Sequence, residues 1–477
     1  MRIIRDLFPA ERLDRPIEEV IKLDQQEEDT VRHEIEEYVT TERIQEAYER
    51  FLREYGDGLA NPDERVGVWI SGFFGSGKSS FAKNLGYILQ NRALGDRSAS
   101  DLFMERVRES RSDRARRLDE MIRFINARIP TRVIMFDVRL IASQGSEPVH
   151  QLMYAKLLED LDYAGDLDIA ELEIELEGEG RLAEFVTTSA RLFRGEVGRP
   201  REPHPVPVTL GGVSQSDYDV WVMMRKGAQA FQRIVAVLRE VSPGLYEGTD
   251  SAALLRGRAQ LNIDVLVDRT FELASRRAPG HAIAYIIDEV GSYVALSVNK
   301  IEDLRKVVEH FGQEGANRVR SGRAVAPVWV MVTSQEKLDE VVQAIDDKRV
   351  ELARLQDRFA IKIDMSPSDI REVASLRVLR KTDPGARHLG TVYDNYHAQL
   401  KSHTRLQQQA PVVEVTREEF IQYYPYLPQF IDLSIQIVSG LRSQSGAFKQ
   451  LGGSNRTIIK QAHEMLVSER TGLQGLA

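Results

Sequence analysis

Residues 72–79 carry the pattern with the clearest chemistry in the chain. They read Gly-Phe-Phe-Gly-Ser-Gly-Lys-Ser, a complete G-x-x-x-x-G-K-S match. Glycines let the backbone curl until successive amides point at phosphate oxygens, and a following helix adds positive potential there. Lys78 would reach the β- and γ-phosphates, and the Ser79 hydroxyl would hold Mg²⁺. The motif predicts a loop that binds ATP with Mg²⁺ through Gly72, Gly75, Ser76, Gly77, Lys78, Ser79 and Ser80.

A second cluster of reactive side chains closes the apolar run at 282–289, which ends in Asp288 and Glu289. Asp288 at a strand end can organise Mg²⁺ beside Ser79. Glu289 can orient and deprotonate the water that attacks the γ-phosphate. Helix or turn capping is the alternative for such an acid pair, but a phosphate loop in the same chain favours the catalytic interpretation.

Three further polar residues are candidate assistants. Thr333 ends another apolar run and could sense the γ-phosphate or hold the water, while Ser334 beside it could simply cap a helix starting near Gln335. Arg358 precedes a short apolar run and could act on a neighbouring subunit's nucleotide as an arginine finger, or form a surface ion pair. Arg456 opens the last helical pattern, where a cation opposes the helix dipole, and could reach back to the phosphates.

Composition excludes several other kinds of chemistry. The 477 residues include no cysteine, so disulfides, thiolate metal sites and cysteine nucleophiles are absent. The nine histidines show no metal-ligand spacing, and the net charge of −9 argues against general polyanion binding. No apolar run is long enough to span a membrane and the polar start is unlike a signal peptide, so we expect a cytoplasmic protein.

The elements around these residues alternate as in an α/β protein. Apolar runs at 66–70, 131–138, 282–289, 327–333 and 359–363 predict five strands of a parallel sheet, and helical patterns fill the gaps. Because the carboxyl ends of parallel strands meet at one edge, the polar residues would converge there. We expect an N-terminal helical extension over 1–60, a nucleotide-binding core over 61–365 with helical insertions at about 90–130 and 145–275, and a helical lid over 366–477.

Two charged segments carry competing interpretations. Arginines over 106–128 could track a phosphate backbone, but interleaved acids equally predict i,i+4 pairing on a solvated helix. Residues 171–179 alternate acids with apolar or glycine residues and predict either an exposed edge strand or a charged helix face. The glutamates could form a metal site, but solvated charge is the favoured interpretation. Helical patterns include one over 221–238, and the four prolines of 198–207 predict an extended loop.

The order of these motifs resembles that of the AAA+ ATPases. More narrowly, the sequence resembles the BrxC/PglY family of BREX bacteriophage-defence systems in blocks spread over almost the whole chain. The matching blocks are RPIEEVI at 15–21, EYVTT at 37–41, VWISGFFGSGKSSFAKNL at 68–85, DEVG at 288–291, VWVMVTSQE at 328–336 and LQDRF at 355–359. Members of that family are typically much longer, so the resemblance concerns their N-terminal ATPase part.

The resemblance implies a fold, a function and partners. The fold is a P-loop AAA+-like (ASCE) five-stranded parallel sheet with a helical insertion and a C-terminal helical lid domain. The function is ATP binding and hydrolysis in a defence complex, and the chain would form a homo-oligomer. The partners would be the PglZ-type protein, BrxB and the PglX-type methyltransferase, with DNA contacted directly or through them. The alternative is a nucleotide-gated scaffold that recruits BREX partners with little hydrolysis.

Overall fold

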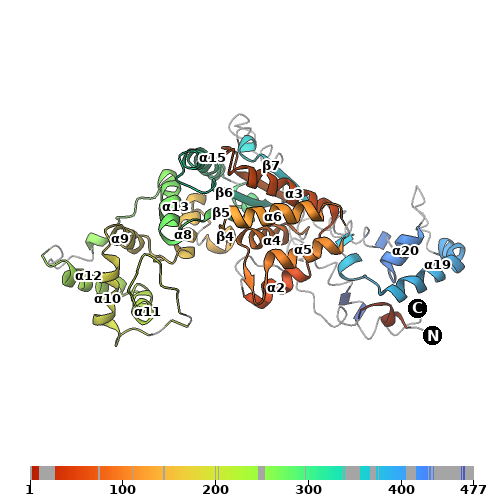
Figure 1. Cartoon of the computed structure of the whole chain (residues 1–477), viewed down its shortest axis with the longest axis horizontal. Coiled ribbons are helices and arrows are strands. Elements are labelled where there is room, and N and C mark those ends of the chain that lie inside the picture. The colour runs from red at the N-terminus through yellow and green to blue at the C-terminus, as the bar shows by residue number, and fades with distance from the viewer. Residues whose placement is uncertain are drawn as a thin grey trace.

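The protein is built on a five-stranded parallel sheet (Figure 1). The computed structural model describes residues 3–9, 27–72, 76–110, 112–142, 145–198, 200–201, 203–244, 253–295, 297–335, 337–338, 355–365, 372–373, 375–403, 415–427, 429–430, 433, 463–464 and 466–467. Across the sheet the strands run β4 (Thr131–Asp137), β5 (Ala282–Asp288), β6 (Trp329–Ser334), β1 (Gly67–Gly72) and β7 (Ile361–Met365). All five predicted strands are confirmed, the last of them two residues further along the chain than expected.

The strand order places the polar strand ends beside one another. β1, which leads into the phosphate loop, lies between β7 and β6, and β6 separates it from the acid-ended β5. The register aligns Ser71 with Ser334 and Asp137 with Asp288. Helices cover both faces of the sheet, so the strand residues are buried almost without interruption. Their apolar, β-branched side chains suit such an environment. This is an α/β fold with a five-stranded parallel sheet, as the sequence predicted.

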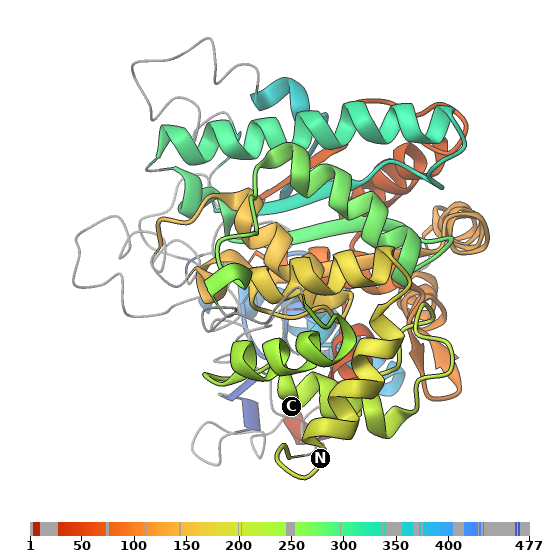
Figure 2. The same ribbon diagram turned by 90° about the vertical axis from the view of Figure 1, so that its left-hand side faces the viewer.

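Two layers of helices enclose the sheet. On one face α4 (Lys78–Gln90) packs against β1, β4, β5 and β6, and is itself covered by α5 (Ala99–Glu109) and α6 (Ala115–Arg128). On the other, α8 (Val149–Asp160), α13 (Ile263–Arg277) and α15 (Val298–Arg320) lie side by side (Figure 2). Short elements complete this part: β2 (Ala93–Leu94), β3 (Arg97–Ser98), α7 (Val138–Ile141), η2 (Ala253–Leu255) and α14 (Val290–Val294).

A helical lobe is inserted between α8 and α13 and contains α9 (Leu167–Gly178), α10 (Leu182–Phe193), α11 (Gln215–Met224) and α12 (Ala230–Val241) (Figure 1). The prediction of a single helix over 221–238 is wrong. Two helices occur there, and Gly227 between them has a φ of +85°, a left-handed conformation that interrupts a helix. The described residues of 198–207 form no helix or strand, as predicted.

Most of the acidic segment 171–179 lies in α9 and is therefore helical. The prediction that its glutamates are solvated is wrong for two of them. The side chains of Glu173 and Glu177 are 1% and 2% exposed. Glu173 pairs with Arg225 at 2.7 Å and accepts a hydrogen bond from the indole of Trp221 at 2.6 Å. These partners compensate the buried charge and bind α9 to α11.

The N-terminal extension is divided between two hydrophobic cores. In its helices, α2 (Glu28–Glu36) and α3 (Glu42–Asp57), apolar residues pack into the main core. Thr41 caps α3, its hydroxyl accepting from the Ile44 amide at 3.2 Å. By contrast, Leu7 of η1 (Ile4–Leu7) packs into a separate cluster with α19 (Asp383–His403) and α20 (Arg417–Tyr423).

The C-terminal region is helical in its described elements. Predictions that fall on residues 10–26, 339–354 and 434–462 lie outside the described part of the chain, and Arg456 is among them. Within the described part, no helix combines the length and the apolar character needed to cross a membrane.

Candidate functional site

The phosphate loop joins β1 to α4, and Gly72 and Gly77, the two glycines of the loop that the structure describes, adopt backbone conformations that favour glycine. Gly72 has a φ of +155°, and a Cβ at this position would lie 2.5 Å from Ser76 Oγ and 2.9 Å from the Met365 carbonyl oxygen. Gly77 has a φ of +97° and immediately precedes Lys78, the first residue of α4. The chain therefore turns tightly enough to aim the α4 amino terminus at whatever the loop encloses.

Ser76 and Lys78 give this loop the donors that an anion requires. Ser76 is 6% exposed, and its hydroxyl has no hydrogen-bond partner among the residues that the structure describes. Lys78 is 4% exposed, so its ammonium is largely withdrawn from water. A buried hydroxyl without a partner, a buried cation and a helix amino terminus form a donor set that fits phosphate oxygens. Gly75 lies outside the described residues.

Asp288, at the end of β5, is the acid best placed to hold a metal ion beside the loop. It is 5% exposed, and it accepts hydrogen bonds from the hydroxyls of Thr333 and Ser79. Burial raises the pKa of its carboxyl, and these two hydrogen bonds together with nearby Lys78 oppose that rise. Mg²⁺ in nucleotide sites commonly has one or two carboxylates as ligands besides phosphate oxygens and water, so Ser79 and Asp288 fit the predicted ion.

Glu289 is held in a strained conformation directly after Asp288. Its φ of +58° is left-handed, which is uncommon for a residue with a side chain. The backbone amide of Glu289 donates to the Thr333 hydroxyl at 3.0 Å, and the Gln335 side-chain amide donates to its carboxylate at 3.2 Å. Burial raises the pKa of Glu289, while Arg139 and Lys78 partly offset the effect. A carboxylate with a raised pKa is suited to accept a proton near neutral pH.

Gly291 fixes the start of α14 against the end of β6. A Cβ at position 291 would lie 1.8 Å from Ser334 Oγ and 2.5 Å from Ser334 Cβ. Only a glycine lets the two elements approach this closely. The contact holds Glu289 next to Thr333 and Gln335, so the two strand ends form one structural unit.

Arg139 is a site residue that the sequence analysis missed. It lies on α7, after β4, with a guanidinium nitrogen 3.8 Å from a carboxylate oxygen of Glu289. The same guanidinium contacts Asp137 at 2.9 Å, and Asp137 caps α7 by accepting from the Arg139 amide at 2.8 Å. Asp137 closes its strand as Asp288 does, and that shared polar strand end was the signal in the sequence that could have pointed to Arg139.

The predicted assistants do not all converge. Thr333 lies at the centre of the site and is fully buried. Arg358 lies at the opposite end of β1, where a Cβ at Gly67 would be 2.4 Å from the Arg358 carbonyl oxygen, and its guanidinium pairs with Glu309. The surface ion pair considered for Arg358 is thus present within the chain, with Glu309 as its partner. Its role toward a neighbouring subunit stays a prediction.

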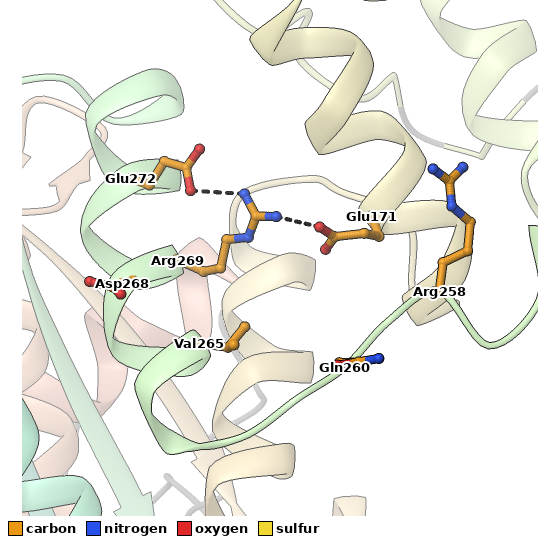
Figure 3. Close-up of a pocket in the computed structure, with 7 residues that line it drawn as sticks. All are labelled: Glu171, Arg258, Gln260, Val265, Asp268, Arg269 and Glu272. Carbon is orange, nitrogen blue, oxygen red and sulfur yellow. Dashed lines mark hydrogen bonds and ion pairs between the residues drawn. The ribbon is translucent and has the colours of Figure 1, made fainter.

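A separate pocket of about 400 Å³ lies between α9 and α13 (Figure 3). Its lining residues are Glu171, Arg258, Gln260, Val265, Asp268, Arg269 and Glu272. In Figure 3 Arg269 points between Glu171 and Glu272 and contacts both, the latter at 2.8 Å. These charges compensate one another and connect the inserted lobe to α13. We therefore interpret the pocket as part of a junction between these elements and not as a second nucleotide site.

Comparison with known proteins adds little to this description. No protein-family model matches the sequence. Among solved structures, the chain is similar to the Aeropyrum pernix Orc1 protein in complex with DNA, with 11% identity over 91% of this chain and 81% of that one. The TM-score is 0.26, a weak overall likeness. The α/β fold described above is therefore taken from the sheet itself and not from this likeness.

Proposed function

We propose that the chain binds and hydrolyses ATP as the AAA+-like component of a cytoplasmic BREX bacteriophage-defence complex. The observation that supports ATP hydrolysis most directly is the convergence of Lys78, Ser79, Asp288 and Glu289 on the space after β1. Ser79 and Asp288 approach one another through a hydrogen bond. Lys78 is close enough to both Asp288 and Glu289 to oppose the rise that burial causes in their pKa values. Cation and one metal ligand from the start of α4 are then assembled with the second metal ligand and the base at the end of β5.

Each residue has a separate part in the proposed reaction. The loop amides and Lys78 bind the phosphates, and Ser79 with Asp288 positions Mg²⁺, which neutralises charge on the transferred phosphoryl group when bound. Glu289 accepts the proton of the attacking water. Gln335 and Arg139 orient the Glu289 carboxylate from two sides, and Thr333 joins its backbone to Asp288.

The place in a BREX complex is proposed from the sequence resemblance alone. It implies partners of the PglZ, BrxB and PglX types and a homo-oligomer of this chain. Direct DNA binding by α5 and α6 has less support, because their arginines pair with acids: Arg106 with Glu109, Arg108 and Arg123 with Asp119, and Arg114 with Glu49. We therefore propose that DNA is contacted mainly through the partners.

The decisive experiment measures ATP binding by calorimetry and steady-state ATP turnover of the whole chain. Lys78→Ala should weaken ATP binding about 10- to 150-fold, since a charge-assisted contact to phosphate contributes about 1.5–3 kcal/mol. Glu289→Gln should keep the affinity and lower turnover about 10²- to 10⁴-fold, the usual contribution of a general base. Glu314→Gln, on α15 and paired with Arg318, is the matched control. Wild-type protein without binding heat would refute the proposal.

A nucleotide-gated scaffold is the second candidate, and one observation favours it. The carboxylate of Glu289 is already contacted by Gln335 and by Arg139, which would restrain a base while no partner is present. In that case ATP binds with similar affinity, turnover is low, and Glu289→Gln changes turnover little. Adding each proposed partner in turn separates the two candidates, since only an active ATPase gains turnover that Glu289→Gln removes.

A further inference from the structure

A buried ion pair connects the phosphate-loop helix to the N-terminal extension. Lys83, on α4, places its ammonium 2.9 Å and 3.0 Å from the two carboxylate oxygens of Glu34 on α2. The side chains are 1% and 7% exposed, and the Tyr87 hydroxyl donates to the same carboxylate at 3.3 Å. A buried pair of this kind resists separation, because removing either partner leaves an uncompensated charge.

The pair lies close to the phosphate loop along a rigid element. Lys83 is five residues after Lys78 on one continuous helix, a rise of about 7.5 Å. Further contacts hold α2 to the core, including Arg32 to the Leu94 carbonyl at 2.6 Å and Arg106 to the Glu36 carbonyl at 3.2 Å. A shift of α2 would therefore be transmitted to the α4 amino terminus.

The other end of α2 is joined to the C-terminal helical region. Glu37, the residue after α2, forms an ion pair with Arg377, and Glu109 on α5 lies 3.4 Å from Arg380. The start of the chain makes a second attachment to that region. Leu7 is fully buried in the C-terminal cluster, and its carbonyl accepts from the Thr382 amide at 2.9 Å. The extension is thus anchored in both cores.

We propose that Glu34 is a positioning residue for the phosphate loop and that α2, through Glu34 and Glu37, couples nucleotide binding at α4 to the C-terminal helical region. This inference rests on the proposed nucleotide binding. It gives the extension a function that a docked helical pair would not have. Binding at Lys78 and Ser79 fixes α4, α4 fixes α2 through Lys83, and α2 fixes the segment that carries Arg377.

The test is hydrogen–deuterium exchange of the full chain with and without a slowly hydrolysed ATP analogue, combined with calorimetry. In wild-type protein we expect the analogue to slow exchange in the phosphate loop and also in residues 4–8 and 375–403. Glu34→Gln should weaken analogue binding about tenfold, as for one lost interaction of ordinary strength, and abolish the distant protection. Asp29→Asn, an exposed change on α2, should keep both.

A second variant keeps the test decisive if Glu34→Gln does not fold. Glu37→Gln removes a partly exposed charge and should retain analogue affinity while losing the protection of 375–403. Combining Glu37→Arg with Arg377→Glu should restore that protection, which a merely structural role would not predict. Analogue binding with no distant protection in wild-type protein would overturn the coupling alone. Absence of any binding heat would instead refute the proposed function.

Discussion

The hydroxyl of Thr333 donates a hydrogen bond to the carboxylate of Asp288, although the two residues are 45 positions apart. The hydroxyl oxygen of Thr333 also accepts a hydrogen bond from the backbone amide of Glu289 at 3.0 Å. One side chain on β6 thus sets the geometry of both acids at the end of β5. A hydroxyl is required for this, because it can donate to one group while accepting from another.

Removing that hydroxyl should affect folding stability and turnover together. Thr333→Val keeps the shape of the side chain but leaves Asp288 and the Glu289 amide each short of a partner inside the core. We expect a loss of about 1–3 kcal/mol in the free energy of unfolding, measured by chemical denaturation, and reduced ATP turnover. Thr333→Ser, which keeps the oxygen, should stay near wild type in both. Equal behaviour of Val and Ser would show that the hydrogen bonds are unimportant.

The charge of Asp288 should cost stability while the site holds no nucleotide. Burial raises the pKa of Asp288 above its ordinary value of 3.8. The folded state therefore binds more protons than the unfolded state between these two pKa values, and stability falls as pH rises through that window. We expect Asp288→Asn to melt at a higher temperature than wild type at neutral pH, with the difference vanishing in acid.

Asp63 is a control for that experiment, because its pKa shift has the opposite direction to that of Asp288. Its hydrogen bonds and ion pair with Arg65 lower its pKa, so its contribution to stability is present above the unfolded pKa and is lost as pH falls. Asp63→Asn should therefore melt at a slightly lower temperature at neutral pH, an effect kept small by its exposure. Identical melting shifts for both variants would contradict the assigned pKa directions.

Arg139 should set the acidic limb of the pH–rate profile. Burial raises the pKa of Glu289, and the Arg139 guanidinium is the strongest of the effects that oppose this rise. Arg139→Ala should raise the pKa further, so turnover should begin to fall at a higher pH than in wild type. Arg139→Lys keeps the positive charge and should shift the limb less. A profile unchanged in the Ala variant would mean that Arg139 does not act on the base.

Glu173 should be among the most sensitive positions of the inserted lobe. It pairs with Arg225, whose side chain is 3% exposed, and also accepts from the Ala164 amide at 2.6 Å. Glu173→Gln leaves the Arg225 charge with less compensation, so we expect a loss of about 3–5 kcal/mol in denaturant unfolding. Glu175→Gln, which breaks the more exposed pair with Arg258, should lose about 0–1 kcal/mol. A similar loss in both variants would contradict the burial of Glu173.

Arg358 tests whether the site needs a neighbouring subunit. In the single chain it pairs with Glu309, which also pairs with Arg305, and it lies at the end of β1 away from the phosphate loop. If Arg358 acts as an arginine finger, Arg358→Ala should lower ATP turnover about 10³-fold or more. Specific turnover should then no longer increase with protein concentration. Turnover that keeps its concentration dependence in this variant would exclude that role.

The sequence predicted best what depends on local pattern. The phosphate loop, the five strands and the acids of β5 are each signalled within a few neighbouring residues. Parallel pairing then requires their polar ends to share an edge, which is why Thr333 could be assigned to the site before its hydrogen bonds were known. The N-cap of α3 at Thr41 is a local feature of the same kind, because a cap interacts with its own helix.

Features that depend on distant partners were missed. Glu173 is separated by 52 residues from the arginine that compensates it, so the local pattern of α9 shows only alternating acids and predicts solvation. Arg139 follows a strand that ends in an acid, as β5 does, but its proximity to Glu289 arises only when β4 pairs with β5. The break at Gly227 was overlooked because apolar spacing continues on both sides of it.

The absence of a side chain at position 291 has a mechanical consequence. With less than 2 Å between a would-be Cβ and Ser334 Oγ, α14 lies directly against the tip of β6, with no room for a side chain between them. In the proposed reaction, a displacement of one tip should therefore carry the other, which would preserve the spacing between Glu289 and the Thr333 hydroxyl. Differences between states of the site would then come from groups on other elements, Lys78 from α4 and Arg139 from α7.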